Sequence, residues 1–327
     1  MSDLSAVVVN YQGRDFIRDC LASFRGEDAE LVVVDNASTD GSPEIVREEF
    51  PEAALVQLPR NVGFGAGVNA GLRGTSGRWV FLLNNDATVE PGALAELLTV
   101  GEGDERIGSV AAQIRFRARP DLINSAGIGV DRLGVAFDRL LGRPLTESES
   151  APVEVFGASA GGALLRRSML DELGGFDERF FLFLEDVDLA WRARMRGWRA
   201  MYAPAAVVHH HHSATARHGS AFKHYHVGRN RMRLLAKNAD AAQLRHYGVA
   251  IAGYDVAQTI FVIAAGRTLA PLRGRLAGLR EWRKVRRAAE EGRRPVELAP
   301  VGGLRQALRR NRAWALGSGS VAQQQRP

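Results

Sequence analysis

Residues 6–34, AVVVNYQGRDFIRDCLASFRGEDAELVVV, begin and end with short runs of β-branched and other apolar residues. The apolar residues between these runs have the spacing of one helix face: Phe16, Ile17, Cys20, Leu21 and Phe24. Such a stretch is typical of a strand, a helix and a second strand. Further apolar runs follow at 54–57 and 79–83. Alternating strands and helices predict an α/β fold with a mostly parallel sheet and helices on both faces.

Polar side chains follow the predicted strands at the points where ligands bind in sheets of this kind. Asn10 and Tyr11 follow the first run, and Asp35 and Asn36 follow the second. A carboxylate at a strand end can accept a hydrogen bond from a nucleobase, so Asp35 is a candidate nucleotide contact. The turn after it, Asp40–Pro43, has the composition of an ordinary helix start.

Three more polar residues, Asn84, Asn85 and Asp86, directly follow the fourth apolar run. Oxygen atoms at the end of a buried strand suit Mg²⁺ or Mn²⁺, which would take further ligands from phosphate and water. An ordinary turn rich in asparagine and aspartate is also compatible with this segment. The segment alone leaves both interpretations open.

A glycine-rich stretch, RNVGFGAGVNAG at 60–71, follows the third predicted strand. It is similar to a dinucleotide-binding fingerprint, but Val68 holds the last glycine position and the fingerprint belongs after the first strand. The stretch therefore argues against an NAD enzyme. It favours a backbone that passes close to a ligand, with Arg60 available for a phosphate.

The segment FFLFLEDVDLAWRAR, at 180–194, places Glu185, Asp186 and Asp188 within four residues after five apolar ones. Carboxylates at this spacing raise one another's pKa, and an apolar wall adds to the effect. One interpretation is a solvated first turn of a helix, where acids complement the helix dipole. The other is a functional cluster that serves a cation, a proton or a substrate.

Length and composition indicate a large globular protein in a reducing compartment. The 327 residues suffice for one large domain with an appendage or for two domains, and 46% of them are apolar. The single cysteine, Cys20, cannot form an internal disulfide. The first residues, MSDLSAVVVNY, lack the basic and apolar regions of a signal peptide. We therefore expect a cytoplasmic protein.

The basic character of the chain is concentrated near its C-terminal end. Residues 1–266 carry 28 Lys and Arg against 33 Asp and Glu, whereas residues 267–312 carry 14 against 4. Such a segment can bind nucleic acid or an anionic membrane surface. It lacks the aromatic residues of a single-strand binder and any zinc or helix-turn-helix signature, so we expect a membrane and no nucleic acid.

An apolar segment at 247–272 lies just before the basic one. It is interrupted by Asp255, Gln258 and Thr259, which fall near one face of a helix. This pattern favours a helix lying in a membrane interface over one that spans the membrane. A helix packed on the core of the protein fits the pattern equally well.

Six motifs occur in an order that resembles a known enzyme family. They are VVVNYQGRDFIRDCLASF, VVVDNASTDGS, RNVGFGAGVNAGL, FLLNNDATVEPGAL, the long segment from Gly161 to Trp198, and PAAVVHHHHSAT. Together, over about residues 4–238, they resemble the inverting family 2 glycosyltransferases with a GT-A fold, particularly the rhamnosyltransferase-like branch. The resemblance implies a GT-A domain at 1–240, a basic helical extension at 241–312 that could associate with a membrane, and a flexible tail at 313–327.

The resemblance also implies which residues contact the nucleotide-sugar donor. They are Asn10, Tyr11, Asp35, Asn36, Arg60, Asn61, Gly63, Asn69, Asn84, Asn85, Gly161, Gly162 and Arg229. Asp186 matches the catalytic base of the family, with Glu185 as its neighbour and Asp188 as a supporting acid. Lys237 matches a basic element near the substrates, although a solvated helix face explains it too.

For the metal, the resemblance implies that Asp86 and His209 bind Mg²⁺ or Mn²⁺. Asp86 matches the last acid of the family's D-x-D motif, and Asn84 replaces the first acid, which should weaken metal binding. His209 lies four residues before Ser213, as the metal-binding histidine of the family does, and His210 is the second choice. The sequence disfavours a four-histidine site, because only alternate strand residues share a face.

The implied function is transfer of a sugar, with rhamnose from dTDP-rhamnose as the first choice, in the synthesis of cell-surface polysaccharide. The acceptor would be a saccharide or a polyprenyl-diphosphate-linked saccharide at the inner face of the cell membrane. A family 2 transferase that uses a UDP-hexose, UDP-N-acetylhexosamine or UDP-galactofuranose is the alternative. A nucleotidyltransferase is less compatible, because Asn10-Tyr11-Gln12-Gly13 is no phosphate loop. An inactive nucleotide-binding partner subunit is less compatible because Asp86, Asp186 and His209 are all present.

Overall fold

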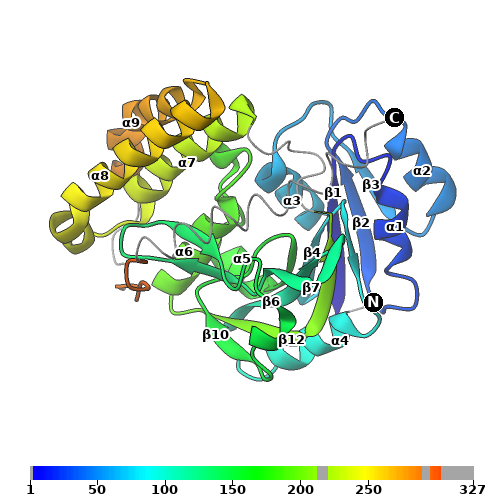
Figure 1. Cartoon of the computed structure of the whole chain (residues 1–327). Coiled ribbons are helices and arrows are strands. Elements are labelled where there is room, and N and C mark those ends of the chain that lie inside the picture. The colour runs from blue at the N-terminus through cyan, green and yellow to red at the C-terminus, as the bar shows by residue number, and fades with distance from the viewer. Residues whose placement is uncertain (1–2, 212–219, 289–294, 303–327) are drawn as a thin grey trace.

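The computed structural model describes residues 3–211, 220–288 and 295–302. These residues form one large mixed sheet, a small two-stranded sheet and helices around both (Figure 1). The strands of the large sheet are β1 (Leu4–Asn10), β2 (Glu30–Asp35), β3 (Ala54–Gln57), β4 (Trp79–Asn84), β5 (Ala87–Val89), β6 (Ile107–Phe116), β7 (Arg119–Ser125), β10 (Val153–Val155), β11 (Gly162–Arg166) and β12 (Arg199–His210). The small sheet pairs β8 (Ile128–Val130) with β9 (Ala136–Asp138).

The helices come from all parts of the chain. Those of the first two thirds are α1 (Ile17–Ala22), α2 (Ser42–Glu49), α3 (Phe64–Leu72), α4 (Ala93–Gly101), α5 (Arg167–Leu173) and α6 (Glu185–Met195), with 3₁₀ turns η1 (Leu145–Glu147) and η2 (Glu178–Phe180). The last third contributes α7 (Ala221–Asn238), α8 (Ala241–Gly266) and α9 (Ala270–Arg287).

The order of strands across the large sheet is β10, β12, β6, β11, β4, β1, β2, β3. The four strands expected from the sequence, β1 to β4, are present and pair in parallel. β11 lies antiparallel between β4 and β6, so the sheet is mixed. The α/β class and the helices on both faces are confirmed.

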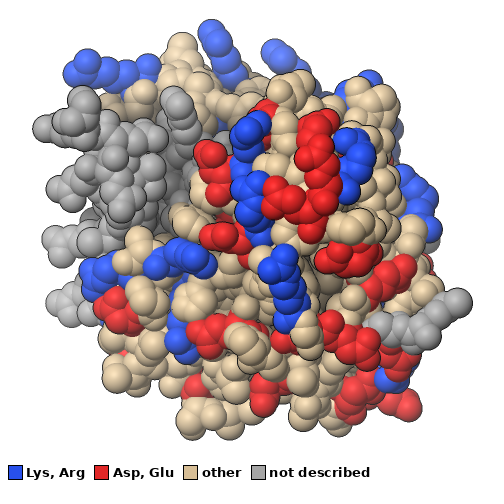
Figure 2. All heavy atoms as spheres, turned by 90° about the vertical axis from the view of Figure 1, so that its right-hand side faces the viewer, with Lys and Arg blue, Asp and Glu red and all other residues tan. Residues whose placement is uncertain are grey.

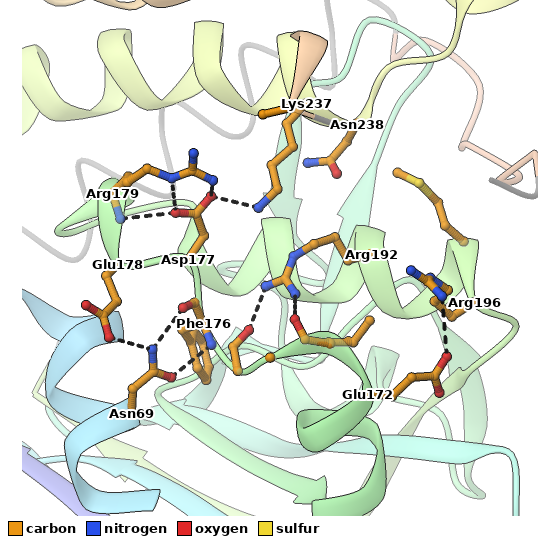
Figure 3. Close-up of a pocket in the computed structure, with 15 residues that line it drawn as sticks. Asn69, Glu172, Phe176, Asp177, Glu178, Arg179, Arg192, Arg196, Lys237 and Asn238 are labelled. Atoms are coloured by element: carbon orange, nitrogen blue, oxygen red, sulfur yellow. Dashed lines mark hydrogen bonds and ion pairs between the residues drawn. The ribbon is translucent and has the colours of Figure 1, made fainter. Parts of the chain in front are cut away.

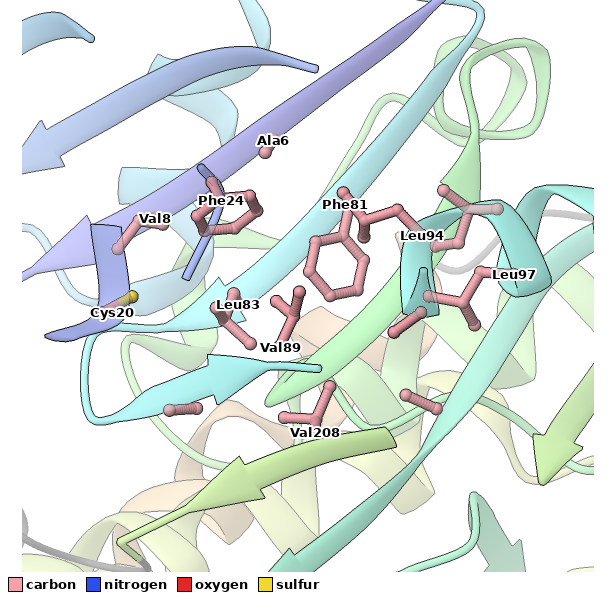
Figure 4. Packing of buried hydrophobic residues seen from close by; sticks show 14 of the residues in the cluster. Ala6, Val8, Cys20, Phe24, Phe81, Leu83, Val89, Leu94, Leu97 and Val208 are labelled. Atoms are coloured by element: carbon pink, nitrogen blue, oxygen red, sulfur yellow. The ribbon is translucent and has the colours of Figure 1, made fainter. Parts of the chain in front are cut away.

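Alternation along β1 divides the core between the two faces of the sheet. Leu4, Ala6 and Val8 belong to the cluster under α1, α2 and α4 (Figure 4). Val7 and Val9 belong to the cluster that contains residues of α3, α5 and α6. Because both faces of β1 are buried, its sequence is continuously apolar instead of alternating.

Cys20 belongs to the first of these clusters, on the side of α1 that faces the sheet (Figure 4). Its thiol is fully buried, and its Sγ lies 3.5 Å from the carbonyl oxygen of Asn84 at the end of β4. Burial raises the pKa of this thiol far above its usual range. Cys20 is therefore an unreactive core residue beneath the end of the central strand.

The three C-terminal helices are held together by a buried ion cluster. Asp255 on α8 accepts hydrogen bonds from Arg231 on α7, at 2.7 Å, and from Arg275 on α9, at 3.0 Å. Ile251 and Thr259 lie one turn away from Asp255 on either side and are also buried. α8 therefore turns one narrow face toward α7 and α9, and α7 packs closely along α9.

The rest of α8 faces outward and is apolar. The helix is long and apolar enough to cross a membrane by length and composition, yet only 17% of its most apolar window is buried. Exposed apolar side chains on α8 and α9 include Val249, Val256, Ile260, Phe261, Leu272, Leu276 and Leu279. Segment 247–272 thus has one narrow face packed on α7 and α9 and a broad exposed apolar face. The expected tail at 313–327 lies outside the described residues.

Charge is distributed differently on the opposite side of the molecule. The side with α1 and α2 displays acidic and basic side chains mixed over the same surface (Figure 2). On α9, by contrast, the exposed charged residues are all basic: Arg273, Arg280, Arg283, Lys284 and Arg287.

Candidate active site

A cavity of about 680 Å³ lies where the carboxyl ends of β1, β2 and β4 meet. The ends of β1 and β2 form its wall on one side of β4, and β6, β7 and β9 form the opposite wall. Residues 181–183 and the start of α7 complete it. The predicted site residues that line the cavity are Tyr11, Asn36, Asn61, Gly63, Asn84, Asn85, Asp86 and Gly161.

Asp86 and His210 lie together on this cavity wall. Asp86 follows β4, and its Oδ1 lies 3.1 Å from Nε2 of His210 at the end of β12. The same ring nitrogen lies 3.3 Å from the amide nitrogen of Asn84. Burial lowers the pKa of His210, but the Asp86 carboxylate outweighs burial, so the pKa is raised overall. Asp86 and His210 are the pair through which the chain could hold a cation.

The prediction that His209 lies beside Asp86 is wrong. Consecutive strand residues point to opposite faces, and His209 points away from the cavity, with its Nε2 2.6 Å from Oε1 of Glu90. A run of identical histidines does not specify which member faces inward, because only the register of β12 against its neighbours decides it. His212 lies outside the described residues.

The chemistry of the Asp86 and His210 pair fits a hard divalent cation. A carboxylate oxygen and an imidazole nitrogen are both ligands that Mn²⁺ accepts, and Mg²⁺ favours the oxygen. Among the described residues, no group of three or more His, Cys, Asp and Glu is gathered for a metal. Of the described residues, Asp86 and His210 would be ligands, and a bound diphosphate and water would supply others.

Asn10 and Asp35 lie behind the cavity wall instead of lining it. The buried Asn10 side chain donates to Asp35, at 3.0 Å, and to Ser42, at 2.8 Å, and accepts from Asn85, at 3.0 Å. Asp35 also accepts from the backbone N–H of Ser38 at 3.0 Å. The sequence predicted that Asn10 and Asp35 contact a nucleotide directly. In the structure they instead support the lining residue Asn85 and the loop after β2.

Asn36 and Gly63 bring two loops together at the nucleotide side of the cavity. Asn36 donates to the carbonyl of Gly63, at 3.0 Å, and accepts from the N–H of Val62, at 2.8 Å. Gly63 has φ +87°, and a Cβ there would lie 2.2 Å from the carbonyl oxygen of Phe181. Only glycine fits this close approach. The glycine-rich segment thus lets the backbone after β3 pack against the loop before α6.

Asp186 lies in the first turn of α6 beside the cavity. Its Oδ2 accepts from the N–H of Ala160, at 3.3 Å, and its Oδ1 from the N–H of Val187, at 2.8 Å. Ala160 lies between two residues that line the cavity, Ser159 and Gly161. Burial raises the pKa of Asp186 despite these two donors. A carboxylate with raised proton affinity next to a cavity is a suitable general base.

The other two acids of the cluster have different environments. Glu185 is buried, its Oε2 has no hydrogen-bond partner, and burial, followed by the charge of Asp186, raises its pKa well above the usual range. Asp188 is fully buried but accepts from Arg192, Lys237 and Asn238 at 2.8–2.9 Å. Burial raises the pKa of Asp188, but the two cations outweigh burial and lower it. Asp188 therefore anchors α7 to α6.

The profile of one protein family, described as glycosyl transferase family 2, matches residues 5–174, which is more than half of the chain. The chain belongs to glycosyltransferase family 2. It is therefore an enzyme, a glycosyltransferase of the hexosyltransferase type. The resemblance seen in the sequence motifs is confirmed.

Relatives of this glycosyltransferase include two named enzymes. The N-acetylglucosaminyl-diphospho-decaprenol L-rhamnosyltransferase of Mycobacterium tuberculosis (strain H37Rv) is 31% identical over 239 residues, covering 64% of this chain and 76% of the relative. The low-salt glycan biosynthesis hexosyltransferase Agl10 of Haloferax volcanii is 24% identical over 277 residues, covering 80% of this chain and 86% of the relative.

Solved structures support the GT-A-like fold. GalNAc-T7, in complex with UDP, GalNAc and Mn²⁺, superposes with a TM-score of 0.59 at 17% identity, covering 76% of this chain and 50% of that chain. The mannosyltransferase PcManGT of Pyrobaculum calidifontis, in complex with GDP-Man and Mn²⁺, superposes with a TM-score of 0.54 at 19% identity, covering 86% of both chains.

A second cavity of this glycosyltransferase, of about 470 Å³, is lined by a network of ion pairs and hydrogen bonds that connects helices (Figure 3). Lys237 binds both Asp177, at 2.7 Å, and Asp188, at 2.9 Å, and Arg179 pairs with Asp177. Asn69 donates to the carbonyl of Phe176 and accepts from its N–H, both at 2.9 Å. Asn69, expected to contact the donor, instead holds α3 against the segment before α6, and Lys237 connects α7 to that segment and to α6.

Three further predicted contacts do not line the active-site cavity of the glycosyltransferase. Arg60 is exposed beyond the cavity, and Gly162 belongs to β11, where it pairs with Leu83 of β4. Arg229 donates to the carbonyl of Arg179, at 3.0 Å, and pairs with Glu281 of α9, at 3.6 Å. Arg229 therefore connects α7 to η2 and α9.

Several residues that line the cavity of the glycosyltransferase were not predicted from the sequence. One group forms the wall beyond β4: Ile114, Asn124, Ser125 and Asp138. A second group covers the cavity: Phe181, Leu182, Phe183, Ser220 and Phe222. The side-chain oxygen of Asn124 accepts a hydrogen bond from Nδ1 of His210 at 2.9 Å, so Asn124 orients the ring. β7 ends in Asn124-Ser125, much as β4 ends in Asn84 and is followed by Asn85. This similarity could have been used to predict Asn124 and Ser125 from the sequence.

Proposed function

We propose that this glycosyltransferase moves rhamnose from dTDP-rhamnose, with inversion, onto a saccharide attached to a polyprenyl diphosphate, in the synthesis of a cell-surface polysaccharide. The observation that carries the proposal is that Asp86 and His210 lie on the same cavity as the loop that holds Asp186. The name of the mycobacterial relative, an L-rhamnosyltransferase with a diphospho-decaprenol acceptor, supports the choice of sugar and acceptor.

In this proposal, the nucleotide lies against Asn36 and Asn61, at the ends of β2 and the loop after β3. The donor diphosphate then reaches Asp86 at the end of β4, and the sugar points toward Gly161 and Asp186. Asp186 accepts the proton of the acceptor hydroxyl as that oxygen bonds to the anomeric carbon. The bond from this carbon to the diphosphate oxygen breaks on the opposite face, which inverts the configuration.

Asp86 and His210 are the residues that would hold a divalent cation. When bound there, Mg²⁺ or Mn²⁺ neutralises the negative charge that develops on the leaving diphosphate. His210 is kept in place by Asn124, and Asn84 occupies the position of the first acid of the family's D-x-D motif. Because the chain contributes one carboxylate instead of two at this point, we expect modest affinity for the cation in the absence of the donor.

The apolar cover of the cavity supports a deoxy sugar. Phe181, Leu182 and Phe183 line the cavity side by side. Rhamnose carries a methyl group where a hexose carries a hydroxymethyl group, and a buried hydroxyl without a partner costs about 1–3 kcal/mol. An apolar cover therefore favours the 6-deoxy sugar over UDP-linked hexoses.

We propose further that the enzyme is cytoplasmic and attaches to the inner face of the cell membrane through α8 and α9. The exposed leucines of α9, at 272, 276 and 279, have the spacing of one helix face, with exposed Arg273, Arg280 and Arg283 beside them. Apolar side chains next to cations suit the interface of an anionic bilayer. Spanning by α8 is disfavoured, because its buried Asp255 pairs with arginines of α7 and α9, and α9 is too basic to enter the hydrocarbon.

The decisive experiment compares Asp186→Asn with the wild-type enzyme. Loss of the base should reduce the rate of sugar transfer at least about 100-fold, while the Kd for the donor stays within about threefold. Radiolabelled sugar transfer and calorimetry measure the two quantities. Transfer at the wild-type rate by Asp186→Asn would remove Asp186 from its role.

A panel of nucleotide-sugars tests the choice of donor. Binding of the correct donor with Mn²⁺ should raise the melting temperature, because ligand binding stabilises the folded state by mass action. We expect a larger shift with dTDP-rhamnose than with UDP-glucose, UDP-N-acetylglucosamine or UDP-galactofuranose. A larger shift with a UDP-sugar would replace rhamnose by that sugar. Release of pyrophosphate instead of a nucleoside diphosphate would identify a nucleotidyltransferase.

A further inference from the structure

Asp138 is an acid on the cavity that the proposed mechanism does not use. It ends β9 in the small sheet and lines the cavity together with Ser125 of β7. Burial raises the pKa of Asp138 to about 6, the hydrogen bond from Ser125 opposes this rise, and the charge of Asp186 adds to it. His210 and Lys223 are close enough to act on the same carboxyl. Besides the hydrogen bond from Ser125, the Asp138 carboxyl can accept hydrogen bonds from a substrate in the cavity.

The order of strands indicates which substrate faces Asp138. β1 and β2 lie on one side of β4, and β6, to which β7 is paired, lies on the other side. A donor whose nucleotide lies at the ends of β1 and β2 and whose diphosphate reaches Asp86 spans only the first half of the cavity. The wall with Asp138 therefore faces the reacting sugars, beyond the diphosphate of the donor.

Lys223 places a cation next to this wall. It lies in the first turn of α7, it is 8% exposed, and its Nζ is 5.3 Å from the ring centroid of Phe183. Burial lowers the pKa of Lys223 to about 8, and Asp138 is the charged group that opposes this shift. Asp138, the acid that opposes this shift, lies on the cavity wall beyond β4.

The start of α7 also connects the cavity to the proposed membrane surface. Phe222, next to Lys223, lines the cavity and is 48% exposed. A Cβ on Gly266 would lie 3.8 Å from Nε2 of His224, so the first turn of α7 lies beside the turn between α8 and α9. Exposed Leu269 belongs to that turn. Exposed apolar side chains, Phe222 and Leu269, therefore lie on both of these neighbouring segments.

We propose that Asp138 and Lys223 form the acceptor subsite, in which Asp138 binds hydroxyl groups of the acceptor sugar and Lys223 binds the diphosphate that joins this sugar to its lipid. The inference rests on the proposed function and extends it to the acceptor. In a monosaccharide acceptor the diphosphate lies within one sugar length of the reacting hydroxyl, which suits a subsite with Asp138 on the cavity wall and Lys223 beside the lining residue Phe183. The lipid then leaves past Phe222 toward the turn between α8 and α9.

Calorimetry with two synthetic ligands tests the two residues separately, in the presence of dTDP and Mn²⁺. One ligand is N-acetylglucosaminyl-diphospho-farnesol, and the other is farnesyl diphosphate, which lacks the sugar. Lys223→Met should raise the Kd for both ligands about tenfold or more, and Lys223→Arg should restore most of the affinity. Asp138→Asn should raise the Kd about tenfold for the ligand with the sugar only.

The controls separate a subsite from a structural pair. Melting temperatures of the variants show whether the fold is intact, and Asp121→Asn, at an exposed position of β7, is the matched acid substitution. Unchanged Kd values for both ligands in folded variants would overturn the proposal, as would weakened binding of dTDP instead of the lipid ligands. If the wild-type protein transfers sugar from none of the nucleotide-sugars in the panel, the proposed function is rejected. The binding measurements would still decide whether Asp138 and Lys223 form a subsite.

Discussion

The two adjacent histidines at the end of β12 differ in their surroundings, and this difference is testable with matched substitutions. His210→Ala should weaken Mn²⁺ binding about tenfold or more, because it removes the ring 3.1 Å from Asp86. His209→Ala removes a partner of Glu90 on the other side of the strand and should change the Kd for Mn²⁺ less than about threefold. Paramagnetic titration of Mn²⁺ measures both.

The two histidine variants serve as controls for each other. Excess chelator should stop sugar transfer by the wild-type enzyme, and added Mn²⁺ or Mg²⁺ should restore it. If His209→Ala loses Mn²⁺ binding while His210→Ala keeps it, the cation is held by His209 and not by His210. Activity that is indifferent to chelator would contradict the metal role of Asp86 and His210 together.

Glu185 is expected to make stability depend on pH. Its pKa in the folded state is raised by burial, so unfolding releases a proton at any pH between its unfolded value of about 4.3 and its folded value. The free energy of unfolding contributed by this group therefore falls as pH rises through that range. Glu185→Gln should remove this part of the slope, as measured by urea unfolding at a series of pH values. An unchanged slope would mean that Glu185 is ionised in the folded state.

At the scale of residues, the sequence predicted those site positions that depend on the strand ends. Asn36, Asn84, Asn85 and Asp86 follow predicted strands and line the cavity. The choice between His209 and His210 depends on strand register, which a run of identical residues does not encode. Asp138 belongs to no motif, and only the pairing of β8 with β9 brings it to the site.

At the scale of elements, the loop between η2 and α6 has an unusual backbone. Phe181, Phe183 and Leu184 have φ of 65°, 73° and 68°. Non-glycine residues in this region cost about 1 kcal/mol each or more. The fully buried side chain of Asn230 on α7 lies 2.8–2.9 Å from the carbonyl oxygens of Phe180, Leu182 and Phe183. One amide group therefore holds the strained loop that covers the cavity.

Replacing this amide should loosen the cover. Asn230→Asp keeps the shape but presents an oxygen to the carbonyl groups, and Asn230→Ala removes the group. Both variants should lower the free energy of unfolding by about 2–3 kcal/mol and weaken donor binding, as measured by urea unfolding and calorimetry. Wild-type stability of Asn230→Asp would show that these hydrogen bonds do not hold the loop.

The elements differed in how far they could be predicted. β1, β2 and β4 follow from continuous apolar runs, because both of their faces are largely buried, whereas β3 is a short and partly exposed edge strand. The small sheet of β8 and β9 has three residues per strand and was not predicted, since strands this short carry no periodicity. The strained loop was also not predictable, because Asn230 is about fifty residues away in the sequence and supplies its stabilisation.

At the scale of the whole molecule, we expect the outer face of α8 to bind an anionic bilayer. Ile260→Asp combined with Phe261→Asp places two charges on exposed apolar positions and should reduce co-sedimentation with phosphatidylglycerol-containing vesicles about tenfold or more. Ala95→Asp, on an exposed position of α4, is the control. Equal sedimentation of both variants, or equal binding to vesicles of phosphatidylcholine alone, would contradict a basic and apolar docking surface.

These substitutions are preferable to removing the C-terminal helices. Truncation after Asp240 would leave Arg231 without Asp255 and would expose the apolar side chains that Ile251 and Trp282 cover. An unpaired buried cation costs several kcal/mol, so a truncated protein could lose vesicle binding because it unfolds. The extension was recognisable from its charge, whereas its ion cluster with α7 required the structure.

Because of its position, Cys20 can report how often the enzyme opens locally beneath its active site. The chain has one cysteine, and its thiol is covered by the core and lies 3.5 Å from the carbonyl of Asn84 beneath the active-site cavity. A thiol reagent can therefore modify the protein only during excursions that separate α1 from the end of β4. The rate of thiol modification therefore measures how often this opening occurs. The rate should fall when a donor or a cation occupies the cavity above.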